Sequence, residues 1–372
     1  MDSIAGNALL HTFSNFHRLR DEAITENRPC RSDAEREPIL NKNGLNMLNK
    51  PSSIMVRIYS VSLVASALFI VLYLVFALTG EIFFYESGEA IGAISGWCER
   101  VSGGLFREPA NTLSNIGFMI SGLFMLRVLT AENEWSTEKG NVFIGLNKIS
   151  VLYAVAVIYL GPGSWLMHGT HTEWGGWADN LSMVMYIIFP WLYNLKEMGR
   201  WSVSRFLWTY FIIVIVYSLA RWFFGGRLGI GLDLFGLSIG LWIISESLFK
   251  YWSPRFRWIS GFVGFLVAVV FGISPQDIMS DLVEYWWIIL FWVPALFSTS
   301  RPTLKRAYTP WFFLGMFSYL AAFLIWLQGY PDTPYCQPDS WIQPHAIWHL
   351  MTAFSTWCFF KFYRTERLRS VP

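Results

Sequence analysis

Five residues have types and spacings that could hold a metal ion and a reacting water. Ser164 and His168 stand four residues apart, as do His345 and His349, and Asp179 follows His168 by eleven. A spacing of four places two side chains on one face of a helix, about one turn apart. Three neutral imidazoles with one open position for water form a catalytic zinc site. The pattern predicts zinc bound by His168, His345 and His349.

The other two residues suit hydrolysis of an amide or an ester at such a centre. Asp179 could accept the proton of the water and return it to the leaving group. Ser164 could donate a hydrogen bond to the water or to the developing oxyanion. His171 and Glu173 are rival candidates for ligand and base, but they lie in a polar loop outside the four-residue spacing. The competing interpretation is that the histidines only form hydrogen bonds between helices.

The segments that must position these residues are strongly apolar. Of the 372 residues, 54% are hydrophobic and 15% are charged. In soluble domains, about a quarter of the residues are usually charged. From Arg57 onward, apolar stretches near the ~20 residues that cross a bilayer alternate with polar loops. We predict an all-α, polytopic membrane helix bundle of about ten spans: 58–80, 112–130, 149–169, 179–195, 205–223, 228–249, 256–273, 283–299, 309–328 and 343–363. The weakest, 256–273 and 283–299, could instead form one broken pair.

The distribution of positive charge predicts the orientation of the spans. Ten spans put both termini on one side, and that side holds 24 of the 28 Lys and Arg residues. The other four are Arg100, Arg107, Arg221 and Arg227. Because cytoplasmic loops are rich in Lys and Arg, we predict cytoplasmic termini. The net charge of +2 gives no reason to expect a nucleic-acid partner.

This orientation places the candidate site at one depth. The third span ends, and the fourth and tenth begin, on the extracytosolic side, which would be lumenal or periplasmic. The five residues can therefore meet if their helices are neighbours. Asp179 opens the fourth predicted span, where a helix N-terminus would favour its carboxylate. Ionisable groups are costly inside a membrane, so a functional site is the favoured interpretation.

The same layout predicts the domain organisation. Residues 1–56 are polar and form a mobile cytoplasmic tail, and 57–80 form an extra first span. A membrane domain follows over 81–363, and 364–372 form a basic cytoplasmic tail.

The four cysteines contain no CxxC pair, so a thiolate zinc site is not expected. Cys98 and Cys336 both fall on the extracytosolic side. A disulfide between them is plausible there, and the alternative is two unpaired thiols in apolar surroundings.

The chain resembles the alkaline ceramidases, part of a wider superfamily of seven-span membrane hydrolases that includes the progestin and adipoQ receptors. The likeness covers roughly 96–363 and is thin between 200 and 330. It rests on three motifs: Glu108-Pro-Ala-Asn111-Thr112-Leu-Ser114-Asn115; Ser164-x-x-x-His168 with Asp179; and His345-x-x-x-His349. The resemblance implies zinc on the three histidines, with Asp179 and Ser164 at the bound water. It also implies hydrolysis of ceramide to a sphingoid base and a fatty acid, by a seven-helix core. This chain departs from the family by one extra span at the start and by two inserted helices between Asp179 and His345.

The resemblance further implies a calcium loop before the first core helix. Family members have a carboxylate-rich loop there, which starts with an Asp. Here Gly96 stands at that start, Trp97 and Cys98 follow, and Glu99 and Glu108 remain as possible ligands. Two carboxylates are few for a cation that takes six to eight oxygens. The alternative is that both are solvated loop acids.

We expect a zinc-dependent hydrolase of a membrane lipid, and two other functions stay open. A lipid-sensing receptor of the same architecture would show little turnover, hold its product tightly and dock a partner on the basic loops. A transporter or channel without chemistry would need charged residues at mid-membrane depth on several helices. Asp233 is a candidate, and Glu246 lies near the end of its span, but neither has an obvious cationic partner in the sequence. No particular protein partner is predicted.

Overall fold

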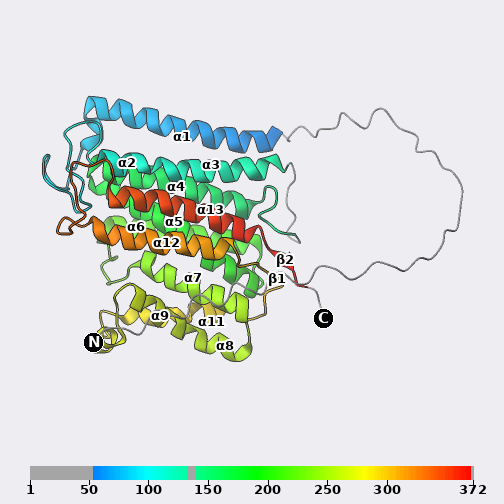
Figure 1. The fold of residues 1–372 in the computed structure, drawn as a ribbon. Coiled ribbons are helices and arrows are strands. Elements are labelled where there is room, and N and C mark those ends of the chain that lie inside the picture. Colours follow the sequence, from blue (N-terminus) through cyan, green and yellow to red (C-terminus); the bar gives the residue numbers. More distant parts are fainter. Residues whose placement is uncertain (1–52, 133–139, 370–372) are drawn as a thin grey trace, which may run out of the picture. The chain divides into compact units, whose positions relative to one another are not determined.

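The computed structural model describes residues 53–132 and 140–369. The predicted tail over 1–56 lies almost entirely outside these residues, as does the end of the predicted C-terminal tail. Figure 1 shows that the described chain is mostly helical. In chain order the elements are α1 Ser53–Thr79, η1 Glu81–Phe83, α2 Pro109–Ser114, α3 Ile116–Ala131, α4 Lys148–Thr170, α5 Glu173–Met198, α6 Val203–Phe224, α7 Leu234–Tyr251, α8 Pro254–Ile259, η2 Ser260–Phe262, α9 Val263–Val270, α10 Pro275–Ser280, η3 Trp286–Trp292, α11 Val293–Phe297, β1 Leu304–Lys305, α12 Trp311–Trp326, η4 Leu327–Gly329, α13 Pro344–Tyr363 and β2 Arg367–Leu368.

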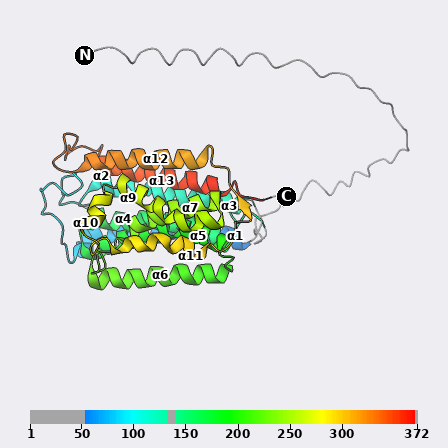
Figure 2. The same ribbon diagram turned by 90° about the horizontal axis from the view of Figure 1, so that it is seen from below.

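Within the described residues, five helical stretches are long and apolar enough to cross a membrane. They are α1, Pro109–Ala131, α4, α6 and Trp311–Gly329. The prediction of an all-α membrane helix bundle is confirmed. The predicted spans 179–195 and 343–363 correspond to α5 and α13, and the predicted span 228–249 is helical only from Leu234, where α7 begins. Figure 1 shows α1 at the outside of the bundle, and Figure 2 shows α6 at the outside. Their exposed apolar side chains suit contact with lipid.

The two weakest predicted spans are broken helices. The segment 256–273 contains α8, η2 and α9, and the segment 283–299 contains η3 and α11. These pieces pack against α7 and against one another. Gly264 allows a close approach, because a side chain there would collide with Phe291 of η3. From the sequence, these two segments could form either two continuous spans or one pair of broken helices. In the structure they form the pair of broken helices.

The described chain begins and ends at the same end of the bundle. Figure 1 shows the start of α1 and the end of α13 at the same end of the bundle, whereas the loops 80–108 and 330–343 lie at the opposite end. An even number of passages along the bundle produces this arrangement. The predicted even number of spans is therefore consistent with the path of the chain from 53 to 369.

Helices α4 and α5 form a tight antiparallel pair. His171 ends α4 in the left-handed conformation, with φ of 51°, and Thr172 then accepts a hydrogen bond from the Gly175 amide at the start of α5. A Cβ atom on Gly163 would lie 2.5 Å from Ser182 of α5, so glycine is required for this close contact. The short connection brings residues near the end of α4 opposite residues about eleven positions later.

A buried charge cluster closes the other end of the bundle. Arg306 donates from Nη1 to Glu246 Oε2 at 2.7 Å and from Nε to Glu366 Oε1 at 2.8 Å. Tyr308 also donates to Glu246, at 2.7 Å. Glu246 thus has the cationic partner that the sequence did not reveal. Residues 364–369, predicted as part of a basic tail, pack against the bundle, and β2 pairs with β1.

Candidate active site

The three predicted zinc ligands form one buried group. His168 lies in the last turn of α4, and His345 and His349 lie in the first two turns of α13. Each ring offers a nitrogen, and these three nitrogens lie within 4.8 Å of one another. The three side chains are buried, at most 6% exposed. A single metal ion could contact all three.

Hydrogen bonds at the outer edge of the group orient two of the rings. His168 Nδ1 lies 2.6 Å from Glu108 Oε2, and His349 Nδ1 lies 2.8 Å from Ser114 Oγ. A histidine that binds a metal usually donates its other N–H to such a partner. His345 Nδ1 is buried and has no hydrogen-bond partner in the described structure. The three histidines fit a zinc ion, because two rings are oriented through Nδ1 and the third has a buried nitrogen without a hydrogen-bond partner.

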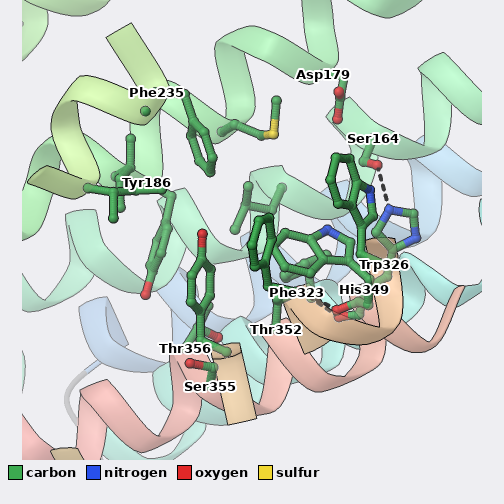
Figure 3. Close-up of a pocket in the computed structure, with 18 of the residues that line it drawn as sticks. Ser164, Asp179, Tyr186, Phe235, Phe323, Trp326, His349, Thr352, Ser355 and Thr356 are labelled. Atoms are coloured by element: carbon green, nitrogen blue, oxygen red, sulfur yellow. Dashed lines mark hydrogen bonds between the residues drawn. The ribbon is translucent and has the colours of Figure 1, made fainter. Parts of the chain in front are cut away.

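Ser164 and Asp179 lie at the same end of the cavity as the histidines. Figure 3 shows both beside His349, and the Ser164 hydroxyl lies 3.3 Å from His349 Nε2. The expectation that Asp179 opens its helix was wrong, because α5 begins at Glu173. Asp179 therefore lies nearly two turns inside α5, where the helix dipole gives little stabilisation. Its side chain is buried, and it lines the space that the three histidines also line.

An apolar cavity leads away from the histidines between α4, α5, α7, α12 and α13. Its volume is about 360 Å³, within the usual range for ligand pockets. In Figure 3, Tyr186, Phe235 and Phe323 line its walls, and Ser355 and Thr356 of α13 lie at its far end. The cavity therefore offers a long apolar space that begins at the candidate metal centre.

Glu99 and Glu108, the two possible calcium ligands, are engaged by protein groups. Glu99 accepts hydrogen bonds from the amides of Ala110 and Asn111 at 2.7 and 2.8 Å. Burial raises the pKa of Glu99, and these two hydrogen bonds oppose the shift. Glu108 contacts His168 and Asn111 through one oxygen and His171 through the other. The residues do not fit a calcium ion, and the alternative of two solvated acids was also wrong, since they are 5% and 1% exposed.

Two orienting contacts were not predicted from the sequence. His171, considered as a rival ligand, instead lies with Nε2 2.6 Å from Glu108 Oε1. Ser114, which contacts His349, was named from the sequence only as a member of the first family motif. Glu108, Asn111 and Ser114 are spaced by three, which places them on one side of a helix. That spacing was the available signal.

The model of one family, described as Ceramidase, matches residues 92–370. The chain belongs to the ceramidase family. No curated protein matches it. The ceramidase match includes the whole candidate site and excludes α1, so the extra first span lies outside the family's shared region.

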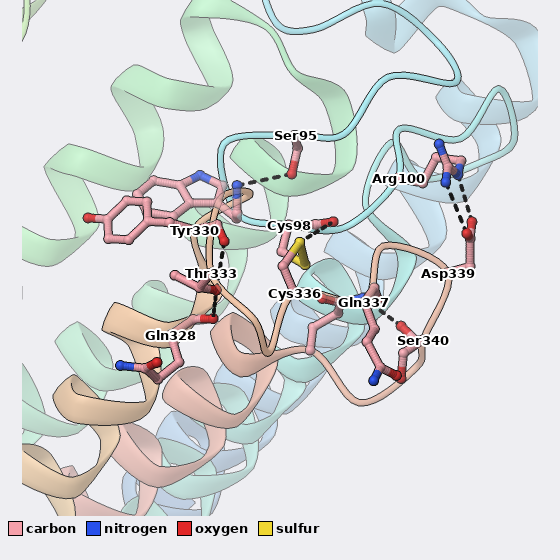
Figure 4. The surroundings of a disulfide bond; sticks show 12 residues. Ser95, Cys98, Arg100, Gln328, Tyr330, Thr333, Cys336, Gln337, Asp339 and Ser340 are labelled. Atoms are coloured by element: carbon pink, nitrogen blue, oxygen red, sulfur yellow. Dashed lines mark hydrogen bonds and ion pairs between the residues drawn. A yellow bond between two sulfur atoms is a disulfide. The ribbon is translucent and has the colours of Figure 1, made fainter.

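A disulfide fixes the loop that leads into the ceramidase core. Cys98 and Cys336 are bonded (Figure 4). Beside them Arg100 Nε lies 2.6 Å from Asp339 Oδ1, a hydrogen bond that holds the pKa of Asp339 below its ordinary value. The neighbouring Trp97 ring lies 4.6 Å from the His345 ring, centroid to centroid. The disulfide thus holds one wall of the candidate site in place.

Replacing both Cys98 and Cys336 with Ser is expected to lower the free energy of unfolding by about 2–4 kcal/mol, because the closed loop is long. Thermal unfolding of the protein in detergent micelles measures this loss. A thiol reductant should lower the unfolding temperature of the natural protein and leave the double variant unchanged. Equal sensitivity of the two proteins would contradict this role for the disulfide.

Changing Glu108 to Gln is expected to weaken zinc binding by about tenfold, because the neutral amide orients and polarises His168 less well than the carboxylate. Competition with a fluorescent zinc chelator gives the dissociation constant. Glu81→Gln, at an exposed position of η1, is the matched control and should bind zinc normally. Unchanged affinity in Glu108→Gln would show that the contact is only structural.

Proposed function

We propose that this ceramidase-family chain is a zinc-dependent intramembrane hydrolase. It would cleave the amide bond of ceramide, or of a related N-acyl sphingoid lipid, to a sphingoid base and a fatty acid. One observation carries the proposal: three buried histidines lie with Asp179 and Ser164 at the end of an apolar cavity. Such a site combines a metal centre with room for a lipid chain.

Zinc bound to the three histidines would lower the pKa of a water and polarise the amide carbonyl. Asp179 would take a proton from that water and deliver it to the leaving amine. Ser164 would donate a hydrogen bond to the carbonyl oxygen as negative charge develops there. Glu108 and Ser114 would keep His168 and His349 oriented through their Nδ1 atoms.

The apolar cavity would bind the acyl chain and thereby position the amide. Its walls, which include Phe235, Phe323 and Trp242, exclude water from the chain. Fixing the amide beside Asp179 and Ser164 contributes to catalysis, because the reacting groups then meet in a productive geometry.

We place this site on the extracytosolic side and both termini in the cytoplasm. The support is the positive charge, 24 of 28 Lys and Arg residues on the side of the termini. The loops beside the histidines lie at the end of the bundle opposite to the start of α1 and the end of α13 (Figure 1).

Lipid analysis of membranes tests the proposal directly. Membranes that contain the natural chain should lose ceramide and gain free sphingoid base, whereas membranes with Asp179→Asn at the same level should do neither. Equal lipid profiles for the two proteins would contradict the proposed function.

A further inference from the structure

We infer that the substrate carries a zwitterionic, phosphate-containing headgroup, which would bind in a polar chamber beside the histidines. This inference rests on the proposed function and specifies its substrate class. Arg221 would bind the phosphate, and Glu173 with neighbouring tryptophans would bind the ammonium group.

The polar chamber adjoins the apolar cavity at the candidate metal centre. Its volume is about 590 Å³, and Trp97, Met167 and His168 line both spaces. In an N-acyl sphingoid lipid, the headgroup carbon is bonded to the carbon that bears the amide nitrogen. With the acyl chain in the apolar cavity and the amide at the histidines, the headgroup would therefore enter the polar chamber. The hydroxyl of plain ceramide would leave much of this space unfilled.

Arg221 is the exceptional cation at this end of the bundle. Three of the four extracytosolic arginines have a carboxylate partner: Arg100 with Asp339 at 2.6 Å, Arg107 with Glu86 at 2.5 Å and Arg227 with Glu284 at 2.6 Å. Arg221, which lines the polar chamber, has no ion pair with any described residue. Its Nε atom is buried without a hydrogen-bond partner. A guanidinium group in this state suits a phosphate, which it can bind through two parallel hydrogen bonds.

The other charged groups of the chamber favour a zwitterion over a simple anion. Glu108 is engaged by two histidines. Glu89 accepts a hydrogen bond from the Gly96 amide at 2.9 Å, and its other carboxylate oxygen lies 3.6 Å from His171 Nδ1. Glu173, in the first turn of α5, has no ion pair in the part of the chain that the structure describes. The chamber thus presents one cation and one carboxylate without an ion pair. These match the two charges of a phosphocholine or phosphoethanolamine group.

Aromatic side chains complete the match to an ammonium group. Trp177 and Trp222 form an edge-to-face pair with ring centroids 5.8 Å apart, and both line the chamber. A cation near the face of a tryptophan is stabilised by the ring quadrupole. Trp177 follows Glu173 by one helical turn, so a carboxylate and an aromatic ring lie on the same side of α5.

The test compares lipids with the same acyl chain and sphingoid base and with a hydroxyl, phosphate or phosphocholine headgroup. Purified full-length protein is assayed in glucoside detergent micelles, so that the substrate supplies the only phosphate. We expect kcat/KM to be about tenfold higher for the phosphocholine lipid than for the hydroxyl lipid. Arg221→Gln should remove this preference, and Glu173→Gln should remove the preference for phosphocholine over phosphate. Arg227→Gln, at an exposed ion pair, is the matched control and should keep both preferences.

An equal or higher kcat/KM for the hydroxyl lipid, or a preference that survives in Arg221→Gln, would overturn the inference and leave the proposed hydrolase intact. A further outcome also overturns the inference: the preference for the phosphocholine lipid is absent, and added phosphatidylcholine stimulates hydrolysis of the hydroxyl lipid in a way that depends on Arg221. The chamber would then bind bulk phospholipid.

If no lipid is hydrolysed, the proposed function fails. Binding of the phosphocholine lipid to Asp179→Asn then decides the inference. If the double variant Asp179→Asn with Arg221→Gln binds the phosphocholine lipid with a dissociation constant about tenfold higher, the inference is supported. An unchanged dissociation constant overturns it.

Discussion

Asp179→Asn is expected to lower kcat for ceramide hydrolysis by about 10²–10⁴-fold, the usual contribution of a general acid–base group. The asparagine amide has nearly the same shape as the carboxylate, but it cannot take the proton of the water. Asp179 does not belong to the group of three histidines that could hold a metal ion, so zinc should stay bound. Turnover by purified protein in micelles, measured with metal content, tests both statements.

Asp332→Asn is the matched control, because Asp332 is an exposed loop residue away from the cavity. It should hydrolyse ceramide at the natural rate. Two results for Asp179→Asn would contradict the assigned role. Near-normal turnover would show that another group moves the proton, and loss of zinc together with activity would show that Asp179 maintains the metal site.

Arg306→Gln is expected to lower the free energy of unfolding by about 3–5 kcal/mol, the usual effect of removing one partner from a buried ion pair. The Arg306 side chain is fully buried between Glu246 and Glu366, which are at most 4% exposed. Without the guanidinium group, both carboxylates remain in a low-dielectric interior with no cation. Unfolding of the purified protein by heat or by denaturing detergent gives the loss of stability.

A further variant separates unpaired charge from simple loss of packing. Combining Arg306→Gln with Glu246→Gln and Glu366→Gln removes all three charges and should recover part of the lost stability. Arg301→Gln, at an exposed position of the same loop, should unfold like the natural protein. If the triple variant is less stable than Arg306→Gln, the charge explanation is wrong.

The candidate site could be predicted from the sequence because its signals are local. A spacing of four places Ser164 with His168, and His345 with His349, whatever the rest of the fold does. The positive charge of the loops predicted the orientation of the spans, which places both pairs at the same depth in the membrane. The six residues between Thr172 and Asp179 were misjudged, because hydropathy locates an apolar stretch, whereas the Thr172 cap decides where α5 begins.

The remaining features depend on contacts between distant parts of the chain, which a single sequence does not reveal. Arg306 follows Glu246 by sixty residues and precedes Glu366 by sixty. Glu108 looked like a calcium ligand because its loop resembles that of other ceramidases, yet in the folded chain two histidines occupy its oxygens. The broken helices near Gly264 and Phe291 follow from tight packing, which hydropathy does not measure.

Zinc content and ceramide hydrolysis, measured on the same purified samples, test the central claim most directly. The natural chain and the His17→Ala control should each hold about one zinc ion, as a three-histidine catalytic site does, and should hydrolyse ceramide. His168→Ala, His345→Ala and His349→Ala should lose both properties, and chelation followed by zinc addition should abolish and restore the activity of the natural chain. Ceramide hydrolysis by zinc-free protein, or full zinc and full activity in His168→Ala, would contradict the account.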